Sequence, residues 1–363
     1  MPSYSGVWTL SQQMQAVGQG LWPPNYIPPA IAVASSSSPY VIAYPWSSSG
    51  FGAKYANPAT LPAGAGWSVA FSPAGDAIAV AHITSPFVTA YPWSSSTGFG
   101  TKYANPTTLP TGTGNGVTFS PSGNAIAVAH QTSPYITAYP WSAATGFGAK
   151  YANPSTLPTG TGNGVAFSPS GDAIAVAHST SPYISAYPWS AATGFGTKYT
   201  DPVTLPAGVV RKVAFSPSGD AIAVAHITSP FVTAYPWSSS TGFGTKYANP
   251  TTLPTLSAFD VTFSPSGNAI AVAAQSSPYI FAYPWSSSTG FGAKYANPTT
   301  IFADTGRSVA FSLSGDTIAV GSDISPFIMA YPWSSSTGFG TKYANPATLP
   351  IDSVVGIAFT GNP

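Results

Sequence analysis

The chain has 363 residues, of which 5% are charged and 44% hydrophobic, and its formal net charge is +1. So weak a charge gives no electrostatic attraction to nucleic acid or to an anionic membrane surface, and neither partner is expected. Cysteine is absent, which excludes disulfides, thiolate metal sites and a cysteine nucleophile.

Residues 1–29 differ in composition from the rest and are interpreted as an N-terminal docking segment with a short helix. Thr9 or Ser11 is suited to cap a helix through Ala16, and the glycines and prolines that follow would end it. The segment is too apolar for a free tail, so we expect it to dock on the adjoining repeat unit of its own chain or on another subunit of a homo-oligomer. The side chains expected to dock are Trp8, Leu10, Met14 and Trp22.

The N-terminus lacks the basic start and long apolar core of a secretory signal, and no apolar run approaches the roughly 18 residues of a membrane span. Membrane insertion is therefore not expected. The letters "SGVWTLSQQMQA", followed by glycine and "WP", resemble a segment near the start of tailed-phage virion proteins, especially tail or fibre-like proteins. This resemblance covers about 20 residues. It implies a virion protein that reaches the outside by host lysis.

From Tyr44 onward, a "YPW" triplet recurs every 47 or 48 residues. Its tryptophans are Trp46, Trp93, Trp141, Trp189, Trp237, Trp285 and Trp333. Proline and glycine occur throughout every unit, and an interior proline costs a helix about 3 kcal/mol, so helical repeats are excluded. Seven β units of this length predict a seven-bladed β-propeller of four-stranded antiparallel blades over residues 30–363.

Four strands fit each unit. In the second unit they are expected at residues 68–72, 77–82, 87–93 and 101–106, named A to D. In strand B, Ile78 and Val80 alternate with alanines, so a large face and a small face are both expected to be buried between stacked sheets. Tyr91 and Trp93 of strand C are interpreted as packing between blades rather than as sugar platforms.

The core "VAFSPSGDAIAVA" resembles the WD-repeat pattern, in which a strand ending in "FSP-G" turns into a strand of small residues. The resemblance covers about 325 residues after Pro24. It implies a propeller blade for each unit. The units depart from the WD-repeat pattern in lacking its Gly-His pair at the start and in having "YPW" where its Trp-Asp pair ends strand C.

The two ends of the repeat region complement each other. Residues 30–34 form a B strand without its A strand, whereas residues 356–363 form an A strand without its B strand. We therefore expect the C-terminal strand to pair with the N-terminal blade, which closes the ring and removes an open sheet edge.

The segments between strands D and A vary, and with the B–C loops they share one face of the predicted propeller. This face is interpreted either as a specific contact surface or as drift in tolerant loops. The candidate contact residues are Trp67, Arg211, Lys212, Phe259, Asp260, Asp304, Arg307, Asp323 and Asp352.

Other polar residues repeat with the units and suggest structural roles. A lysine precedes Asn-Pro or Asp-Pro in every unit, and the lysines are interpreted as protection of an exposed outer strand or as a belt for anionic glycans. They are Lys54, Lys102, Lys150, Lys198, Lys246, Lys294 and Lys342. Four histidines end strand B and are expected to be hydrogen-bonded rather than to bind a metal: His82, His130, His178 and His226.

No catalytic residue, metal ligand or cofactor motif stands out from the repeats, and nearly identical blades supply few unlike groups to one site. We therefore expect a non-enzymatic interaction protein, without cofactor, in a phage particle as a tail-associated or capsid-decorating component. Its expected partners are other virion proteins or host surface glycan, and its location is the virion or the extracellular space. The alternative is a secreted multivalent carbohydrate-binding lectin.

Overall fold

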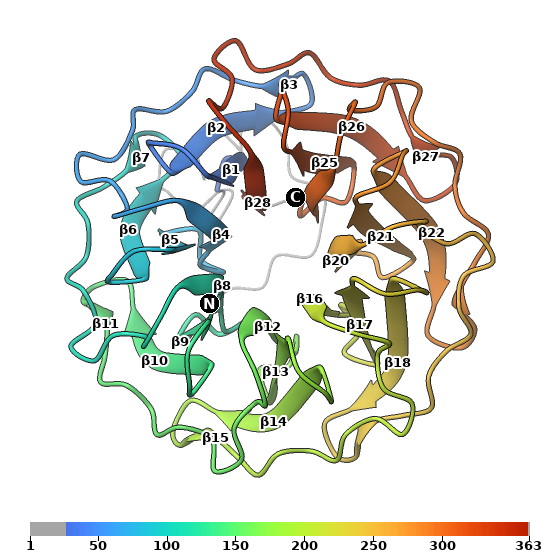
Figure 1. The fold of residues 1–363 in the computed structure, drawn as a ribbon. Coiled ribbons are helices and arrows are strands. Elements are labelled where there is room, and N and C mark those ends of the chain that lie inside the picture. Colours follow the sequence, from blue (N-terminus) through green and yellow to red (C-terminus); the bar gives the residue numbers. More distant parts are fainter. Residues whose placement is uncertain (1–26, 362–363) are drawn as a thin grey trace, which may run out of the picture.

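The computed structural model describes residues 27–361, which form seven four-stranded antiparallel sheets in a ring about a central axis (Figure 1). The predicted all-β, seven-bladed propeller is confirmed. The blades are numbered in chain order from the one that contains β1, and their strands are named A to D from the axis outward. The docking segment and its residues Trp8, Leu10, Met14 and Trp22 lie outside the described residues.

The A strands surround the axis and are β4 (Gly66–Phe71), β8 (Gly114–Phe119), β12 (Gly162–Phe167), β16 (Val210–Phe215), β20 (Ala258–Phe263), β24 (Gly306–Phe311) and β28 (Val354–Thr360). The B strands are β1 (Ala30–Ser35), β5 (Ala77–His82), β9 (Ala125–His130), β13 (Ala173–His178), β17 (Ala221–His226), β21 (Ala269–Ala274) and β25 (Thr317–Ser322).

The C strands are β2 (Val41–Ser47), β6 (Val88–Ser94), β10 (Ile136–Ser142), β14 (Ile184–Ser190), β18 (Val232–Ser238), β22 (Ile280–Ser286) and β26 (Ile328–Ser334). The D strands are β3 (Gly50–Phe51), β7 (Gly98–Phe99), β11 (Gly146–Phe147), β15 (Gly194–Phe195), β19 (Gly242–Phe243), β23 (Gly290–Phe291) and β27 (Gly338–Phe339).

The ring closes through the first blade, whose strand order is β28-β1-β2-β3. Strand β28 is antiparallel to β1, and Ala32 lies opposite Ala358. The expected pairing of the two ends is therefore confirmed, and no blade keeps a free inner edge at the junction. The A–B turns, the C–D loops and both ends of the described chain lie on one face of the ring, which we call the terminal face. The D–A segments and B–C loops lie on the opposite face, which we call the variable face.

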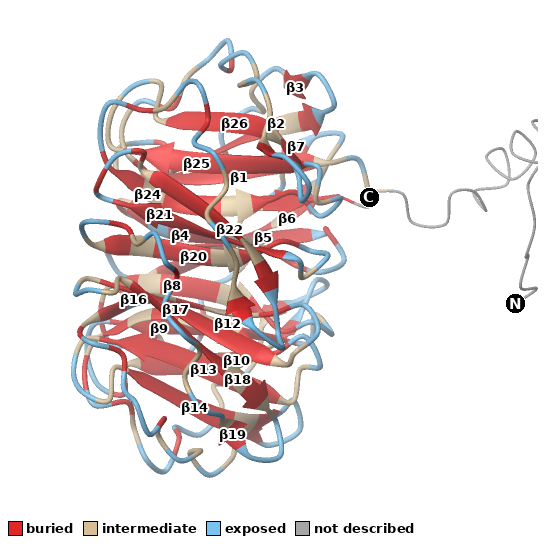
Figure 2. Ribbon diagram, turned by 90° about the vertical axis from the view of Figure 1, so that its right-hand side faces the viewer, coloured by how far each residue is buried: buried red, intermediate tan, exposed pale blue. Residues whose placement is uncertain are grey.

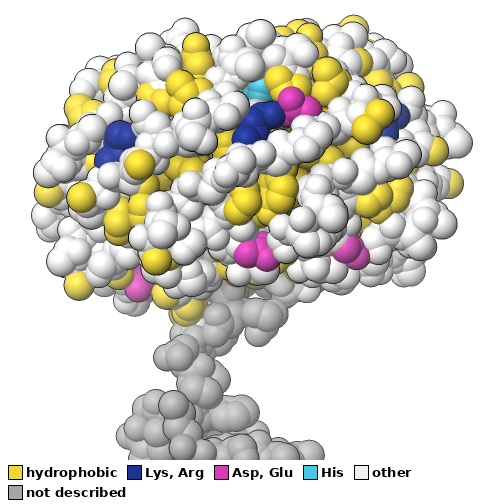
Figure 3. All heavy atoms as spheres, turned by 90° about the horizontal axis from the view of Figure 1, so that it is seen from below, with side chains coloured by type: hydrophobic (Ala, Val, Ile, Leu, Met, Phe, Trp, Pro, Cys, Tyr) yellow, Lys and Arg dark blue, Asp and Glu magenta, His cyan; other side chains and the backbone are white. Residues whose placement is uncertain are grey.

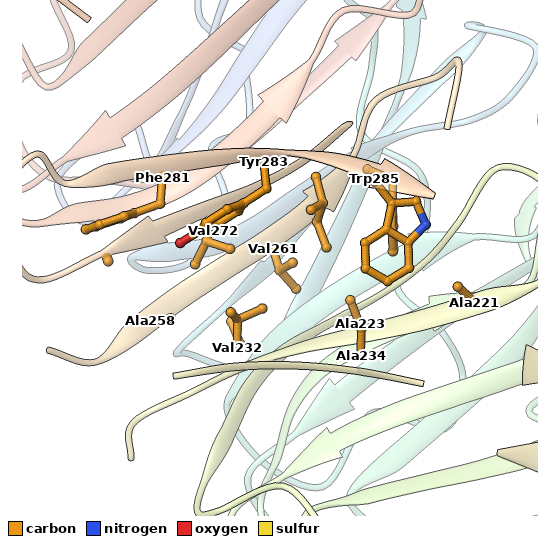
Figure 4. Packing of buried hydrophobic residues seen from close by; sticks show 14 residues of the cluster. Ala221, Ala223, Val232, Ala234, Ala258, Val261, Val272, Phe281, Tyr283 and Trp285 are labelled. Atoms are coloured by element: carbon orange, nitrogen blue, oxygen red, sulfur yellow. The ribbon is translucent and has the colours of Figure 1, made fainter. Parts of the chain in front are cut away.

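The core lies between the blades, where the large face of each sheet meets the small face of the preceding one. Ala223 and Ala234 of the fifth blade pack on Val272, Tyr283 and Trp285 of the sixth (Figure 4). All six residues of every B strand are buried, and exposed residues are concentrated in the loops (Figure 2). The alternation of large and small residues thus predicted the packing correctly.

The tryptophan of each "YPW" triplet is a contact between blades. Trp93 meets Phe71 and Phe99 of its own blade and Tyr55 of the preceding segment in edge-to-face pairs, with ring centroids 5.0–5.1 Å apart. The Tyr55 hydroxyl donates to the carbonyl oxygen of Ser95 at 2.6 Å. The interpretation of these aromatic residues as packing residues agrees with the structure.

Strand D differs from the expectation at residues 101–106. The observed β7 has two residues, Gly98 and Phe99, which pair with Ser94 and Trp93. Gly98 has φ +81°, a conformation that glycine adopts at little cost, so the chain turns back directly after strand C. The segment after β7 then passes along the rim toward the next blade as irregular chain.

Strand C also begins one residue later than expected, at Val88. Phe87 has φ +68° and closes the B–C loop instead. Its amide donates to the carbonyl oxygen of Thr84 at 2.8 Å, and its own carbonyl oxygen accepts from the amide of His82 at 3.0 Å. These two hydrogen bonds offset the unfavourable backbone conformation.

Candidate functional site

Each A strand carries a β-bulge that leaves its second residue unpaired. In β4, Gly66 pairs with His82 and Ser68 pairs with Ala81, so Trp67 has no partner across the sheet. A bulge turns a side chain away from the regular pattern of the strand. The seven bulged residues are Trp67, Asn115, Asn163, Arg211, Phe259, Arg307 and Val355.

The bulged side chains reach the neighbouring A strand. The amide nitrogen of Asn115 donates to the carbonyl oxygen of Gly162, and Asn163 donates to Val210, both at 2.8 Å. The sequence placed these positions in variable segments between strands. The structure places them on the innermost strands, at the end that faces the variable face.

Three consecutive blades replace these asparagines by charged and aromatic residues. Arg211 and Lys212 lie on β16, Phe259 and Asp260 on β20, and Arg307 on β24. Asp323 follows the B strand of the seventh blade. We call these six residues the axial cluster: Arg211, Lys212, Phe259, Asp260, Arg307 and Asp323. Unlike groups therefore converge here, although the blades are nearly identical elsewhere.

Arg307 is fixed from two sides. Its Nε and a terminal guanidinium nitrogen both donate to Oδ2 of Asp323, at 2.7 and 2.6 Å. Its guanidinium carbon lies 4.5 Å from the ring centroid of Phe259. A planar guanidinium that is both ion-paired and stacked loses little further freedom when it contacts a ligand.

The side chain of Arg211 is exposed, and its guanidinium has no hydrogen bond or ion pair with any residue in the described range 27–361. Partial loss of solvent lowers the pKa of its guanidinium, and the positive charge of Arg307 lowers it further. Arginine remains charged in spite of such a shift. Two cations thus lie within electrostatic range of each other, and only Arg307 has a protein counter-ion.

Asp260 is only 9% exposed and connects two blades. Its carboxylate accepts from the amides of Val261 and Val309 at 2.9 and 3.0 Å and from the Ser308 hydroxyl at 2.9 Å. Burial raises the pKa of this carboxyl, although the charge of Lys212 and the three donors oppose the shift.

The hydrogen bond between Asp260 and the next inner strand has a structural counterpart elsewhere in the ring. Ser68 of the second blade stands at the position equivalent to Asp260, and its hydroxyl accepts from the amide of Val117 at 3.3 Å. A serine hydroxyl is therefore enough to bind the amide of the next inner strand. Asp260 adds a negative charge and a second carboxylate oxygen, which that role does not need.

The remaining candidates of the variable face do not join the cluster. Trp67 lies on β4 of the second blade and is 45% exposed. Asp304 accepts from the amide and hydroxyl of Thr305, and Asp352 accepts from the Ser37 hydroxyl at 2.7 Å. Asp304 therefore stabilises its own loop, whereas Asp352 joins the segment before β28 to the B–C loop of the first blade. Ser308, which binds Asp260, was not singled out in the sequence, although its equivalence to Asp260 in the repeat was visible.

The repeated polar residues have local partners. The amine of Lys102 donates to the side-chain oxygen of Asn105 and to the carbonyl oxygen of Tyr103, outside any strand. The lysines therefore tie down irregular chain rather than protect a long outer strand. Basic side chains lie apart from one another on the rim (Figure 3), and among the seven lysines Lys198 pairs with a carboxylate, that of Asp201.

The four histidines are fully buried, as a structural role requires. His82 shares a hydrogen bond of 2.9 Å with Thr89, and burial lowers the pKa of the imidazole to about 4. Within residues 27–361, no group of three or more metal-binding side chains is found. In the same range no helix is long and apolar enough to cross a membrane.

No family model matches the chain, and no curated protein matches it. The fold is similar to solved structures. A provisionally named 6-phosphogluconolactonase of Bacteroides uniformis has 15% identity and a TM-score of 0.70, covering 92% of this chain and 99% of that one. The periplasmic gluconolactonase of Pseudomonas aeruginosa has 14% identity and a TM-score of 0.71, covering 92% and 100%.

The hydrazine synthase of Kuenenia stuttgartiensis also matches, with 13% identity, a TM-score of 0.57 and coverage of 74% and 76%. At such identities the likenesses show the fold alone. The match to a WD-repeat family that the sequence suggested is not found, and the resemblance to phage proteins falls on undescribed residues.

The expectation of a non-enzymatic phage component, or else of a secreted lectin, is corrected by these comparisons. The neighbours described above carry enzyme names, and none is named as a virion protein or a lectin. The physical reason lies in the inner strands. We expected near-identical blades to supply no unlike groups to one site, but the bulges of three blades bring together two arginines, a lysine and a buried carboxylate.

Proposed function

We propose that the axial cluster binds a small anionic sugar acid or its lactone and hydrolyses the lactone ring. The observation that carries the proposal is Arg211, an exposed guanidinium without a protein partner, close to the fixed cation of Arg307 and one strand away from the buried carboxylate of Asp260. An anionic ligand would neutralise the excess positive charge of this site.

The chemistry follows from the same groups. Asp260 takes a proton from water while the water oxygen bonds to the lactone carbonyl carbon, and Arg211 or Lys212 stabilises the oxyanion that forms. The ring C–O bond then breaks, and the leaving oxygen takes the proton back from Asp260. Water is the only co-reactant, and the product is the open hydroxy acid. Burial raises the pKa of the Asp260 carboxyl, which makes its carboxylate a stronger base than an exposed one.

Two further points support the proposal. The structural neighbours named as lactonases agree with this reaction class, and the one named as periplasmic agrees with an extracytoplasmic location. Fold likeness alone does not determine function, so the proposal rests on the axial cluster. The names of the structural neighbours serve only to choose lactones among the possible substrates.

The test uses the full chain with gluconolactone and 6-phosphogluconolactone. Hydrolysis is followed by pH-stat against the spontaneous rate, and binding of gluconate and 6-phosphogluconate by calorimetry. Arg211→Gln should weaken binding roughly 10- to 100-fold, because a hydrogen bond to a charged group contributes about 1.5–3 kcal/mol. Asp260→Asn should keep binding and lower turnover about 10²- to 10⁴-fold.

Lys150→Gln is the matched control, because it removes one positive charge from the rim, away from the axis. It should change neither binding nor turnover. No hydrolysis above the spontaneous rate together with no binding of either acid, or equal effects of Arg211→Gln and Lys150→Gln, would overturn the proposal.

A further inference from the structure

The seam between the seventh and first blades differs from the other six blade interfaces in three ways. The loop between β2 and β3 is one residue shorter than its counterparts, "SSSG" instead of "SSSTG". Leu313 occupies a position that is proline in the other A–B turns. Finally, the first blade has no A–B turn, because its A strand ends at Thr360 and its B strand begins at Ala30.

The A–B turns otherwise form a continuous row on the terminal face, in which each proline packs on the glycine of the next turn. Pro265 lies 3.5 Å from where a Cβ of Gly315 would be, and Pro121 lies 3.6 Å from the same point at Gly171. At the seam this row is interrupted. Leu313 has no following turn to pack on and is 51% exposed.

The interruption leaves a cavity of about 200 Å³, the seam pocket. Its lining combines apolar and polar side chains and includes Trp46, Leu313, Ser314, Asp316 and Phe359. The volume is below the roughly 300–1,000 Å³ of small-molecule sites, so a single side chain fits the pocket better than a metabolite does.

The chain itself supplies a tethered candidate at this place. Pro29 lines the pocket, and Ile27 already packs against the turn of the second blade, 3.0 Å from where a Cβ of Gly75 would be. At the interface of the first and second blades, the N-terminal chain thus replaces the proline that the first blade lacks. At the seam itself, beside Leu313, nothing in the described range replaces the missing glycine turn.

We propose that the seam pocket receives an apolar side chain from residues 5–26 of the same chain. Residues 1–53 contain no Asp, Glu, Lys, Arg or His, so this segment brings no unpaired side-chain charge to the partly apolar pocket. Trp22 is five positions before Ile27, which allows a reach of about 17 Å in extended chain. An indole fills an apolar pocket and offers an N–H donor to acceptors such as those of Ser314 and Asp316.

Cysteine cross-linking tests this proposal directly, because the natural chain has no cysteine and two introduced thiols are the only ones present. The test variant carries Trp22→Cys with Leu313→Cys. The matched control carries Trp22→Cys with Pro121→Cys, which places the second thiol in the equivalent turn of the third blade. Both are oxidised mildly as full chains after circular dichroism has confirmed the β-fold.

We expect an intramolecular disulfide in the test variant and none in the control, because a short tether holds the segment near one turn at high effective concentration. Disulfide-linked dimers would show that a second copy fills the pocket and would overturn the proposal. Equal cross-linking at both turns, or at neither, would also overturn it. As a second measurement, Trp22→Ala should speed hydrogen exchange of residues 312–317, and unchanged exchange would contradict the docking independently of disulfide geometry.

Discussion

The guanidinium of Arg307 lies 4.5 Å from the ring centroid of Phe259, on the neighbouring inner strand, while its nitrogens donate to Asp323. A stacked and ion-paired arginine keeps its orientation whether or not a ligand is present. Within the axial cluster, Arg307 is therefore the fixed cation and Arg211 the adaptable one.

Phe259→Leu should weaken binding of 6-phosphogluconate several-fold, because it removes a cation–π contact of about 0.5–2 kcal/mol while keeping an apolar side chain. Calorimetry at fixed ionic strength measures the change. Trp67→Leu alters the equivalent bulged position of another blade and is the control. If the two variants lose the same affinity, the orientation of Arg307 by Phe259 is irrelevant to binding.

Ser308→Ala should shift the pH profile of lactone hydrolysis to higher pH. The Ser308 hydroxyl donates to Asp260 and lowers the pKa of that carboxyl, so its removal raises the pKa and a higher pH is needed to form the carboxylate base. The profile of kcat/KM is the measurement, and Ser312→Ala in the A–B turn of the same blade is the control. An unchanged or downward-shifted profile would contradict the role of Asp260 as base.

Stability should fall as the pH decreases from about 6.5 to 4, because of the buried histidines. The pKa of each imidazole is about 4 in the folded chain and near 6.5 when unfolded, so protons bind the unfolded state first over this window. Between pH 7 and pH 5 each histidine should reduce the free energy of unfolding by about 2 kcal/mol.

Urea unfolding at the two pH values measures this loss. His226→Ala is a suitable variant, because Ala274 occupies the equivalent position in the sixth blade. The variant should lose correspondingly less stability between pH 7 and pH 5 than the natural chain. An identical loss in both would mean that His226 is not the group that titrates.

Trp189→Ala should lower the free energy of unfolding by about 3–5 kcal/mol, because it empties a position where two blades meet. The indole ring contacts Tyr151, Phe167 and Phe195 in edge-to-face pairs. Tyr151→Phe is the control: it keeps the ring contact and removes only the hydroxyl that donates to Ala191 at 2.6 Å, a loss of about 1 kcal/mol. Denaturant unfolding compares the two, and a similar cost for both would argue against ring packing as the main contribution.

The sequence determined the propeller, the number of blades, the closure and the packing of Ile78 and Val80 against small residues, because strand alternation and repeat period are local properties of the chain. It was less reliable at Phe87 and Gly98, where backbone turns with positive φ shorten strands C and D. The candidate contact residues of the variable face could be picked out by residue type, since Arg211 and Asp260 interrupt a uniform repeat.

Only the tertiary structure decided which of those residues meet. The bulges and the closure of the ring bring Arg307 onto Phe259 and Ser308 onto Asp260, 48 positions apart in each case. Trp67 stays on another blade, Asp304 remains in its own loop, and Asp352 accepts from Ser37 where the two ends of the chain meet. The seam pocket likewise arises only when the two ends of the chain share a blade. Contacts between distant residues depend on how the blades stack around the axis, and no periodicity within one repeat encodes that.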